Sequence, residues 1–142
     1  MKERLVSAET SFKVEFFDVD SMNIVWHGNY VKFMEVGRCA LLDKIGYNYI
    51  AMRKDGFAFP IVEVKVKYVR PLVFNETAVI KSFLVEYENR LKIEYEIYNA
   101  RGELATKAES TQMVVNGATG ETMFVCPPHF IEKVQRAISL GG

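Results

Sequence analysis

The chain has 142 residues, carries no net charge, and is 49% hydrophobic and 25% charged. This length fits one domain and leaves no room for two, and the composition is that of an ordinary globular protein rather than of a disordered chain. Zero net charge argues against whole-surface attraction to nucleic acid or acidic lipid, and no apolar run approaches the roughly 20 residues that a membrane span needs.

The predicted elements begin with a strand and a long helix. Residues 11–17 have strand composition. In residues 29–45 apolar side chains recur at spacings of three and four, which is typical of a helix with one buried face. That face comprises Tyr30, Phe33, Met34, Gly37, Leu41 and Ile45. Asn29 or Gly28 is expected to cap the start of the helix, and Gly46 suits its end.

A short second helix is predicted over residues 47–54, and beyond residue 59 the apolar period changes to two. In the first strand of this region, Val62, Val64, Val66 and Tyr68 face one way while Glu63, Lys65 and Lys67 face the other, as in a half-buried strand. Three more strands are predicted at residues 77–87, 91–99 and 103–116, with turns at 88–90 and 100–102. A final helix, opened by two prolines, is predicted over residues 129–138.

One apolar helix and one antiparallel sheet can bury their apolar faces only against each other. We therefore predict an α+β fold in which a five-stranded antiparallel sheet wraps around one long helix, with a second helix at the C-terminus. Residues 1–142 are predicted to form this single domain.

The number and spacing of the cysteines and histidines indicate which cofactors and which cellular compartment to expect. Cys39 and Cys126 lie far apart and show no metal-type spacing, and His27 and His129 are the only histidines, too few for a typical His-rich metal site. The N-terminal segment lacks the apolar region of a signal peptide. These features predict reduced thiols, a cytoplasmic protein, and no metal or redox cofactor.

The segment between the first strand and the long helix is the most informative for chemistry. Asp18 and Asp20 stand at the predicted strand end, and a short loop leads to His27 at the helix start. A helix N-terminus presents unpaired N–H groups and about half a positive charge, which together can hold a developing oxyanion. A nearby carboxylate can attack a carbonyl or activate water. Acyl transfer needs both parts.

The whole segment resembles the signature D-x-D-x-x-x-[IV]-V-[YW]-[HY]-x-N-Y of 4-hydroxybenzoyl-CoA thioesterase-like hot-dog enzymes, including the YbgC-type acyl-CoA thioesterases. It is present as Asp18, Asp20, Ile24, Val25, Trp26, His27, Asn29 and Tyr30. The order of predicted strands extends the resemblance over most of the chain. One departure is Asn23, which stands where many relatives carry glycine. Asparagine is the next best residue at positive φ, so the loop is expected to keep its shape.

The resemblance implies an enzyme that hydrolyses acyl-CoA to the acid and free CoA. Asp20 would be the catalytic carboxylate, acting as nucleophile or as general base. The backbone N–H of His27, helped by Gly28, would polarise the thioester carbonyl, and the His27 imidazole would assist. The other substrate-binding residues implied are Asn29, Tyr30, Phe59 and Arg90. The family also implies a homodimer or homotetramer with the active site at the dimer interface.

Plainer interpretations stand beside these. Asp20 alone would more often cap a turn, and Asp18 is expected to have a structural hydrogen-bonding role. Glu35 is either ion-paired with Arg38 or, as in some hot-dog thioesterases, an alternative catalytic carboxylate. Phe59 is also a candidate core residue. Two other functions stay open: a hot-dog hydratase or dehydratase, and a non-catalytic module that binds acyl-CoA.

Overall fold

The structure is a computed structural model that describes residues 3–142. Met1 and Lys2, which belong to the N-terminal segment predicted to lack a signal peptide, lie outside the described residues. The elements in chain order are β1 (Val6–Lys13), η1 (Phe16–Asp18), η2 (His27–Asn29), α1 (Tyr30–Ile45), α2 (Tyr49–Asp55), β2 (Phe57–Ala58), β3 (Ile61–Tyr68), β4 (Thr77–Glu86), β5 (Leu91–Tyr98), β6 (Leu104–Gln112), β7 (Val114–Asn116), β8 (Thr122–Met123) and α3 (Pro128–Ser139). The two η elements are single 3₁₀ turns.

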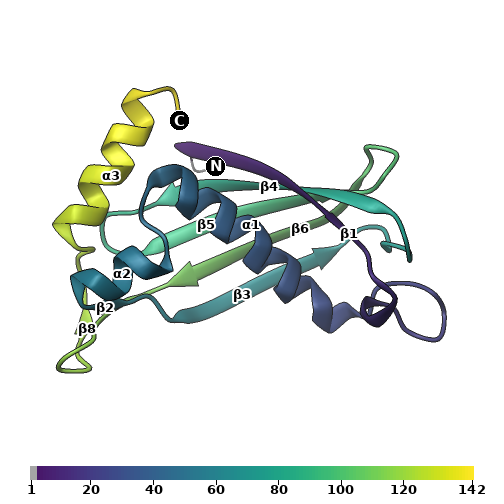
Figure 1. Cartoon of the computed structure of the whole chain (residues 1–142), viewed down its shortest axis with the longest axis horizontal. Helices are drawn as coiled ribbons and strands as arrows, with labels where there is room; N and C mark the ends of the chain where they lie inside the picture. Colours follow the sequence, from purple (N-terminus) through teal and green to yellow (C-terminus); the bar gives the residue numbers. More distant parts are fainter. Residues whose placement is uncertain (1–2) are drawn as a thin grey trace.

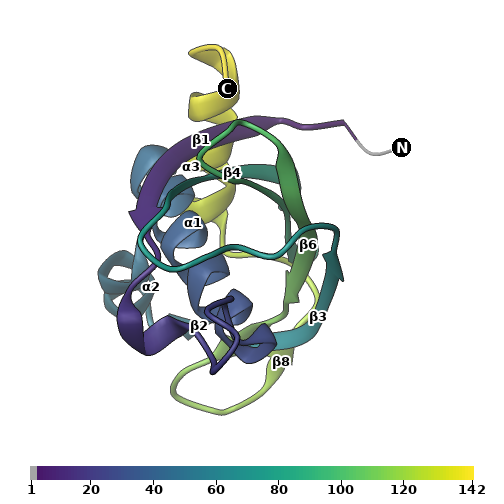
Figure 2. The ribbon, with the colours of Figure 1, turned by 90° about the vertical axis from the view of Figure 1, so that its right-hand side faces the viewer.

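A five-stranded antiparallel sheet in the order β1-β4-β5-β6-β3 curves around α1 (Figures 1 and 2). The central strand β5 shows why the two layers pack. Its side chains alternate between buried and half-buried along the whole strand, and the buried set is Leu91, Ile93, Tyr95 and Ile97. The predicted α+β architecture, with one long helix against the sheet and a C-terminal helix, is confirmed.

The long helix meets the sheet along the predicted face. All six residues of that face are buried, and Leu42 joins them. Gly37 permits the close approach, because a Cβ there would lie 2.4 Å from Ser82 Oγ and 2.9 Å from Ile80 Cδ1 on β4. Gly46 ends the helix at φ 86°, as predicted.

Several predicted boundaries are wrong for tertiary reasons. The first strand is Val6–Lys13 rather than 11–17, because its ladder with β4 begins at Val6. The predicted strand end instead turns into η1, which leaves Phe16 and Phe17 exposed. Asn29 takes the N-cap position of α1, as predicted, but its side chain makes no capping hydrogen bond, because its amide donates to the Asp18 carbonyl oxygen (2.8 Å). The last predicted strand is split into β6 and β7, and β7 joins a small second sheet, β2-β7-β8.

The inward face of β3 is less buried than its alternation predicts. Val64 and Val66 are half-buried, but Val62 and Tyr68 are 58% and 50% exposed. The reason is position: β3 is the last strand of the sheet, and within residues 3–142 no strand pairs with its outer edge (Figure 1). The opposite edge strand, β1, is contacted by α1 and α3.

Side-chain hydrogen bonds connect α3 to α2. Tyr47 Oη donates a hydrogen bond to Asp55 Oδ2 (2.8 Å), and His129 Nδ1 lies 2.8 Å from the same oxygen. Burial opposes ionisation of Asp55, but the hydrogen bonds from Tyr47 and His129 outweigh it and lower the pKa of this carboxyl. Burial, together with the neighbouring carboxylate, raises the pKa of Tyr47.

We expect Asp55→Asn to lower the unfolding midpoint at pH 7 and to matter less in acid. A carboxyl whose pKa is lower in the folded state contributes its stability above its unfolded pKa, which is about 4, and loses that stability as pH falls through the folded value. Thermal unfolding of both proteins between pH 7 and pH 3 checks this, with Asp43→Asn on α1 as the surface control. A difference from wild type that stays constant over this range would contradict the prediction.

Candidate active site

The loop between η1 and η2 is a tight hairpin that holds Asp20 near its tip. Val19 and Val25 form a bridge across it, and the Asp20 N–H donates to the Ile24 carbonyl oxygen (2.9 Å). Asn23 adopts φ 65°, so the expected positive φ is confirmed. The exposed Asp20 accepts one hydrogen bond, from the Met22 N–H to Oδ1 (2.8 Å). Its Oδ2 has no partner among residues 3–142 and remains available to a substrate.

Asp18 is built into the structure in a different way. It is 2% exposed; Oδ2 accepts from the Glu15 N–H (2.9 Å) and Oδ1 is paired with Lys32 Nζ. Its carbonyl oxygen accepts from the Trp26 N–H (3.0 Å) and from the Asn29 amide. This residue therefore ties the loop to the start of α1, which is the structural role predicted for it.

The start of the helix offers free donors. The backbone N–H groups of His27 and Gly28 donate to no acceptor within residues 3–142. Tyr68 of β3 steadies this turn by donating from Oη to the His27 carbonyl oxygen (3.0 Å). The Tyr68 ring also packs edge-on against the buried ring of Tyr30, at 4.9 Å between centroids. Burial raises the pKa of Tyr30, so its hydroxyl stays neutral.

These groups meet in one open pocket of about 400 Å³. It is lined by Asp20, Ile24, Val25, His27, Tyr30, Tyr68, Val69, Arg70 and Pro71. Of the predicted site residues, the structure brings Asp20, His27 and Tyr30 together here, with Gly28 and Asn29 in the same helix start. Tyr68 was not predicted as a site residue. The sequence placed it only on the inward face of a strand, through the alternation of apolar and charged residues, and it offered no other signal for this residue.

Phe59 and Arg90 lie at the other end of the sheet. Strand pairing places Leu91 beside Gln112 at that end, whereas Tyr98 pairs with Leu104 at the Asp20 end. Arg90 is ion-paired with Glu86 across its own turn. Phe59 is buried and lines a second cavity of about 660 Å³ beneath α2. Within one chain, neither residue reaches the Asp20 pocket, so their predicted roles stay predictions.

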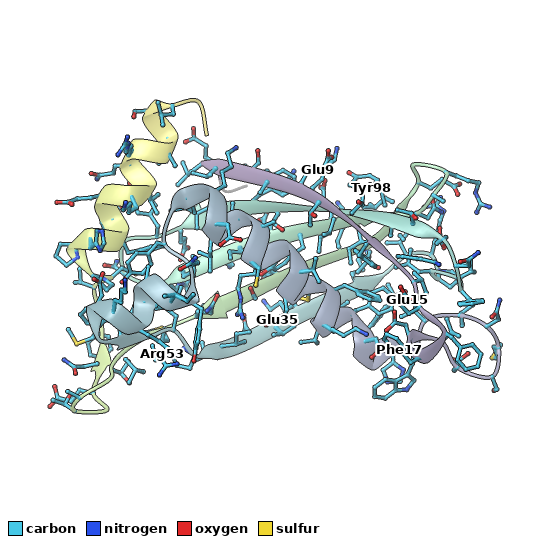
Figure 3. The ribbon with its side chains drawn as sticks, viewed as in Figure 1. Glu9, Glu15, Phe17, Glu35, Arg53 and Tyr98 are labelled. Carbon is cyan, nitrogen blue, oxygen red and sulfur yellow. The ribbon has the colours of Figure 1, made fainter. Side chains whose placement is uncertain are left out.

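The structure also shows the position of Glu35, the alternative catalytic carboxylate. Glu35 lies on α1, more than one turn beyond the helix start, and Figure 3 shows it apart from Glu15 and Phe17 at the loop end of the molecule. It forms the ion pair with Arg38 that the sequence predicts. Within residues 3–142, His, Cys, Asp and Glu side chains do not gather in any group of three that could hold a metal ion.

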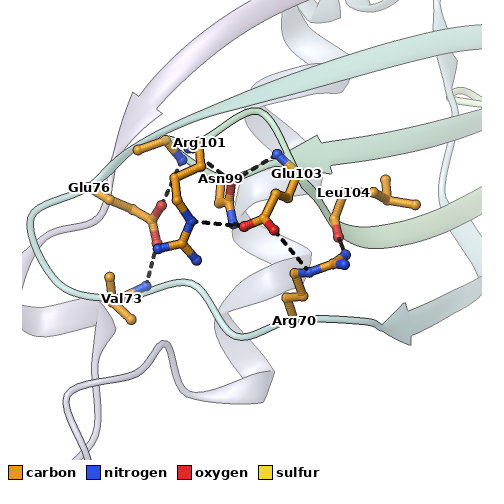
Figure 4. Close-up of polar contacts among 8 residues, drawn as sticks. Arg70, Val73, Glu76, Asn99, Arg101, Glu103 and Leu104 are labelled. Atoms are coloured by element: carbon orange, nitrogen blue, oxygen red, sulfur yellow. Dashed lines mark hydrogen bonds and ion pairs between the residues drawn. The ribbon is translucent and has the colours of Figure 1, made fainter.

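A polar network supports the Asp20 loop from behind (Figure 4). The segment 69–76 bonds to that loop through the Val25 N–H, which donates to the Leu72 carbonyl oxygen (2.8 Å). Glu76 holds this segment in turn, because its carboxylate accepts from the N–H groups of Val73 (2.7 Å) and Ala100 (2.8 Å). Nothing in the sequence pattern singled out Glu76, since its donor Ala100 lies 24 residues further along the chain, in another hairpin of the fold.

Glu76→Ala is expected to lower the free energy of unfolding by roughly 1–3 kcal/mol, because two backbone donors lose a charged acceptor. Chemical denaturation measures this loss. Glu103→Ala is the matched control. The Glu103 carboxylate pairs with the exposed side chains of Arg101 and Arg70 in the same network, but it accepts no hydrogen bond from a backbone N–H of segment 69–76. Equal losses in the two variants would show that support of this segment is not the decisive contribution.

Comparisons with known proteins find relatives along most of the chain. The family model described as the thioesterase-like superfamily matches residues 14–137. A Bacillus subtilis protein provisionally named as an acyl-CoA thioesterase, YneP, is 37% identical over 110 residues, which cover 77% of this chain and 80% of that protein.

Solved structures agree with these relatives. A DHNA-CoA thioesterase from Staphylococcus aureus matches with a TM-score of 0.84 at 26% identity, over 94% of this chain and 92% of that chain. A second Staphylococcus aureus protein, solved in complex with CoA, has a TM-score of 0.83 over 98% of this chain and 86% of its own. At 16% identity, this second likeness concerns the fold alone. The hot-dog fold expected from the sequence is confirmed.

Proposed function

Because the chain belongs to the thioesterase-like superfamily and is a thioester hydrolase, we propose that it hydrolyses acyl-CoA to the free acid and CoA in the Asp20 pocket. One observation carries the assignment to this pocket. A carboxylate with one unpartnered oxygen lines the same pocket as a helix start whose first two N–H groups are free. Those are the two parts that acyl transfer requires.

In the proposed mechanism the thioester carbonyl oxygen points at the N–H groups of His27 and Gly28. Their two donors and the helix dipole stabilise the negative charge that develops on this oxygen. Asp20 attacks the carbonyl carbon, the C–S bond breaks, and CoA leaves as the thiolate. Water then hydrolyses the mixed anhydride and restores the carboxylate. In the alternative route, Asp20 takes a proton from a water that attacks directly.

The oligomer expected from the sequence belongs to this proposal. Among the described residues, 3–142, no strand pairs with the outer edge of β3, and such a free edge favours pairing with another strand. We propose a homodimer joined through this edge, with a homotetramer as its further assembly, and an active site at the dimer interface. The free thiols Cys39 and Cys126 support the proposed cytoplasmic location. Within residues 3–142, no helix is long and apolar enough to cross a membrane.

Thiol release from a panel of acyl-CoA substrates tests the function. The panel should contain short and long aliphatic acyl groups and aromatic ones, since one similar structure is a DHNA-CoA thioesterase. An acyl-carrier-protein thioester belongs in it as well. Release of CoA with a clear acyl preference is the expected result. A changed acyl group without CoA release would favour the hydratase or dehydratase, and binding without any turnover would favour the non-catalytic module.

A further inference from the structure

Tyr68, the last residue of β3, reaches the turn η2 through its hydroxyl group. Its Oη donates to the His27 carbonyl oxygen over 3.0 Å. The same oxygen accepts from the Tyr30 backbone N–H. A carbonyl oxygen has two lone pairs, so these two donors use both of its acceptor positions. The direction of the His27 carbonyl group is therefore set by the helix start and by β3 together.

The peptide bond that follows His27 transmits this constraint to Gly28. A peptide unit is planar, and in its trans form the C=O and N–H groups point in opposite directions. The His27–Gly28 peptide is trans. Fixing the His27 carbonyl oxygen therefore fixes the direction of the Gly28 N–H, which donates to no acceptor within residues 3–142. Hydrogen bonds at the two ends of one peptide also polarise each other, so the bond from Tyr68 strengthens this N–H as a donor.

The other free donor of this turn is fixed without Tyr68. The His27 N–H belongs to the preceding peptide, whose Trp26 carbonyl oxygen accepts from the Asn29 N–H (2.9 Å). That hydrogen bond lies inside η2 and depends on local structure alone. The strand β3 therefore acts on one of the two donors, and it does so through a single side chain.

Packing fixes the position of the Tyr68 ring. It lies edge-on to the Tyr30 ring, with 4.9 Å between the centroids, and Tyr30 is 2% exposed. Tyr30 is itself anchored, because its ring packs edge-on against the buried Phe33 and its Oη accepts from the Leu72 N–H (3.4 Å). Contacts to the core therefore place the Tyr68 hydroxyl group, although the residue is half exposed.

We propose that Tyr68 is a positioning residue of the reaction: its hydroxyl group, through the His27 carbonyl oxygen, directs the Gly28 N–H at the thioester carbonyl oxygen. Tyr68 lines the same pocket as Asp20 and His27, so this hydrogen bond lies beside the place where the substrate is proposed to bind. The inference rests on the proposed function for the identity of the acceptor. Because every acyl thioester presents the same carbonyl group to these donors, the contribution of Tyr68 does not depend on the acyl group.

Tyr68→Phe tests this role, because it keeps the ring against Tyr30 and removes only the hydroxyl group. The Gly28 N–H itself cannot be removed by substitution, and a Cβ at Gly28 would lie 2.1 Å from Trp26 Cζ3. We expect kcat to fall roughly tenfold for each acyl-CoA that is hydrolysed, less than the roughly 10²- to 10³-fold that follows the loss of a whole oxyanion donor. KM should stay within about twofold, since the interaction is made in the transition state.

Tyr98→Phe is the matched control, since Tyr98 also donates from Oη, to Glu96 Oε1 (2.8 Å), and lies outside the lining of the Asp20 pocket. This control should leave kcat and KM unchanged. An unchanged kcat in Tyr68→Phe, an equal loss of kcat in the two variants, or a raised KM with kcat kept would each overturn the positioning role.

Infrared spectroscopy of a bound thioester separates this inference from the proposed function. The probes are benzoyl-CoA and decanoyl-CoA labelled with carbon-13 at the carbonyl, and they are bound to Asp20→Asn protein with and without Tyr68→Phe. Stronger hydrogen bonding lowers the frequency of a carbonyl stretch, so the band is expected at lower frequency when Tyr68 is present. The same band position in both proteins overturns the inference. A wild type that hydrolyses no acyl-CoA rejects the proposed function, whereas the infrared comparison still decides whether Tyr68 acts on a thioester carbonyl.

Discussion

Asp20→Asn is expected to lower kcat for acyl-CoA hydrolysis by roughly 10³- to 10⁵-fold, the scale on which loss of a nucleophile acts. The change removes the attacking oxygen of the nucleophilic route and the proton acceptor of the general-base route, but it keeps the size of the side chain. Asparagine also retains an acceptor for the Met22 N–H, which makes the one hydrogen bond to the Asp20 side chain within residues 3–142. Stability should therefore stay within about 0.5 kcal/mol of wild type, as for other exposed positions.

The control for this variant is Glu35→Gln, which removes the other carboxylate that relatives of this fold can use. Glu35 is ion-paired with Arg38, so its loss should change turnover far less than loss of Asp20. Single-turnover kinetics of both variants, with unfolding curves measured in parallel, separate catalysis from folding. Activity that survives Asp20→Asn and disappears in Glu35→Gln would assign the reaction to the helix carboxylate.

The parts of this fold that the sequence predicts best are those governed by local periodicity. The buried stripe of α1 recurs every three or four residues, and the alternation of β5 is unbroken from Leu91 to Ile97. Both patterns depend on near neighbours in the chain and need no knowledge of the partner element. The turn at Gly102, with φ 78°, follows from the same local chemistry.

The wrong predictions concern segments whose structure depends on a neighbouring element rather than on local sequence. Residues 6–10 are mostly polar or small, so only the ladder with β4 makes them a strand. Val62 and Tyr68 have the alternation of an inner face, but β3 is an edge strand and leaves them exposed. The single-domain prediction for residues 1–142 stays a prediction.

The candidate site divides in the same way. The motif places Asp20 and the helix start close together because they are neighbours in the chain, and the Asp20 pocket contains both. Tyr68 and Glu76 enter through β3 and segment 69–76, which only the folded sheet brings to that loop. Phe59 and Arg90 lie at the far end of the same sheet. Local pattern therefore identifies the reactive groups, and tertiary structure identifies what holds them in place.

Asp18→Asn is expected to lower the free energy of unfolding by roughly 1.5–3 kcal/mol. This loss of stability distinguishes the structural role of Asp18 from the catalytic role proposed for Asp20. Both carboxylate oxygens of Asp18 are engaged, one with the Glu15 N–H and one with Lys32 Nζ, and asparagine can replace only one acceptor. Asp18 is 2% exposed, so a polar group that loses its partner there is poorly compensated by solvent. Chemical denaturation measures this loss, with Asp20→Asn as the matched substitution two residues away.

Turnover distinguishes the roles of the two residues. Protein that remains folded in Asp18→Asn should keep kcat within about tenfold of wild type, because Asp18 is buried behind the loop and positions it without lining the pocket. Asp20→Asn is expected to have the opposite effects: the protein keeps its stability and loses turnover. A fully stable Asp18→Asn protein with no turnover would place the buried aspartate in the chemistry and would transfer to it the role proposed for Asp20.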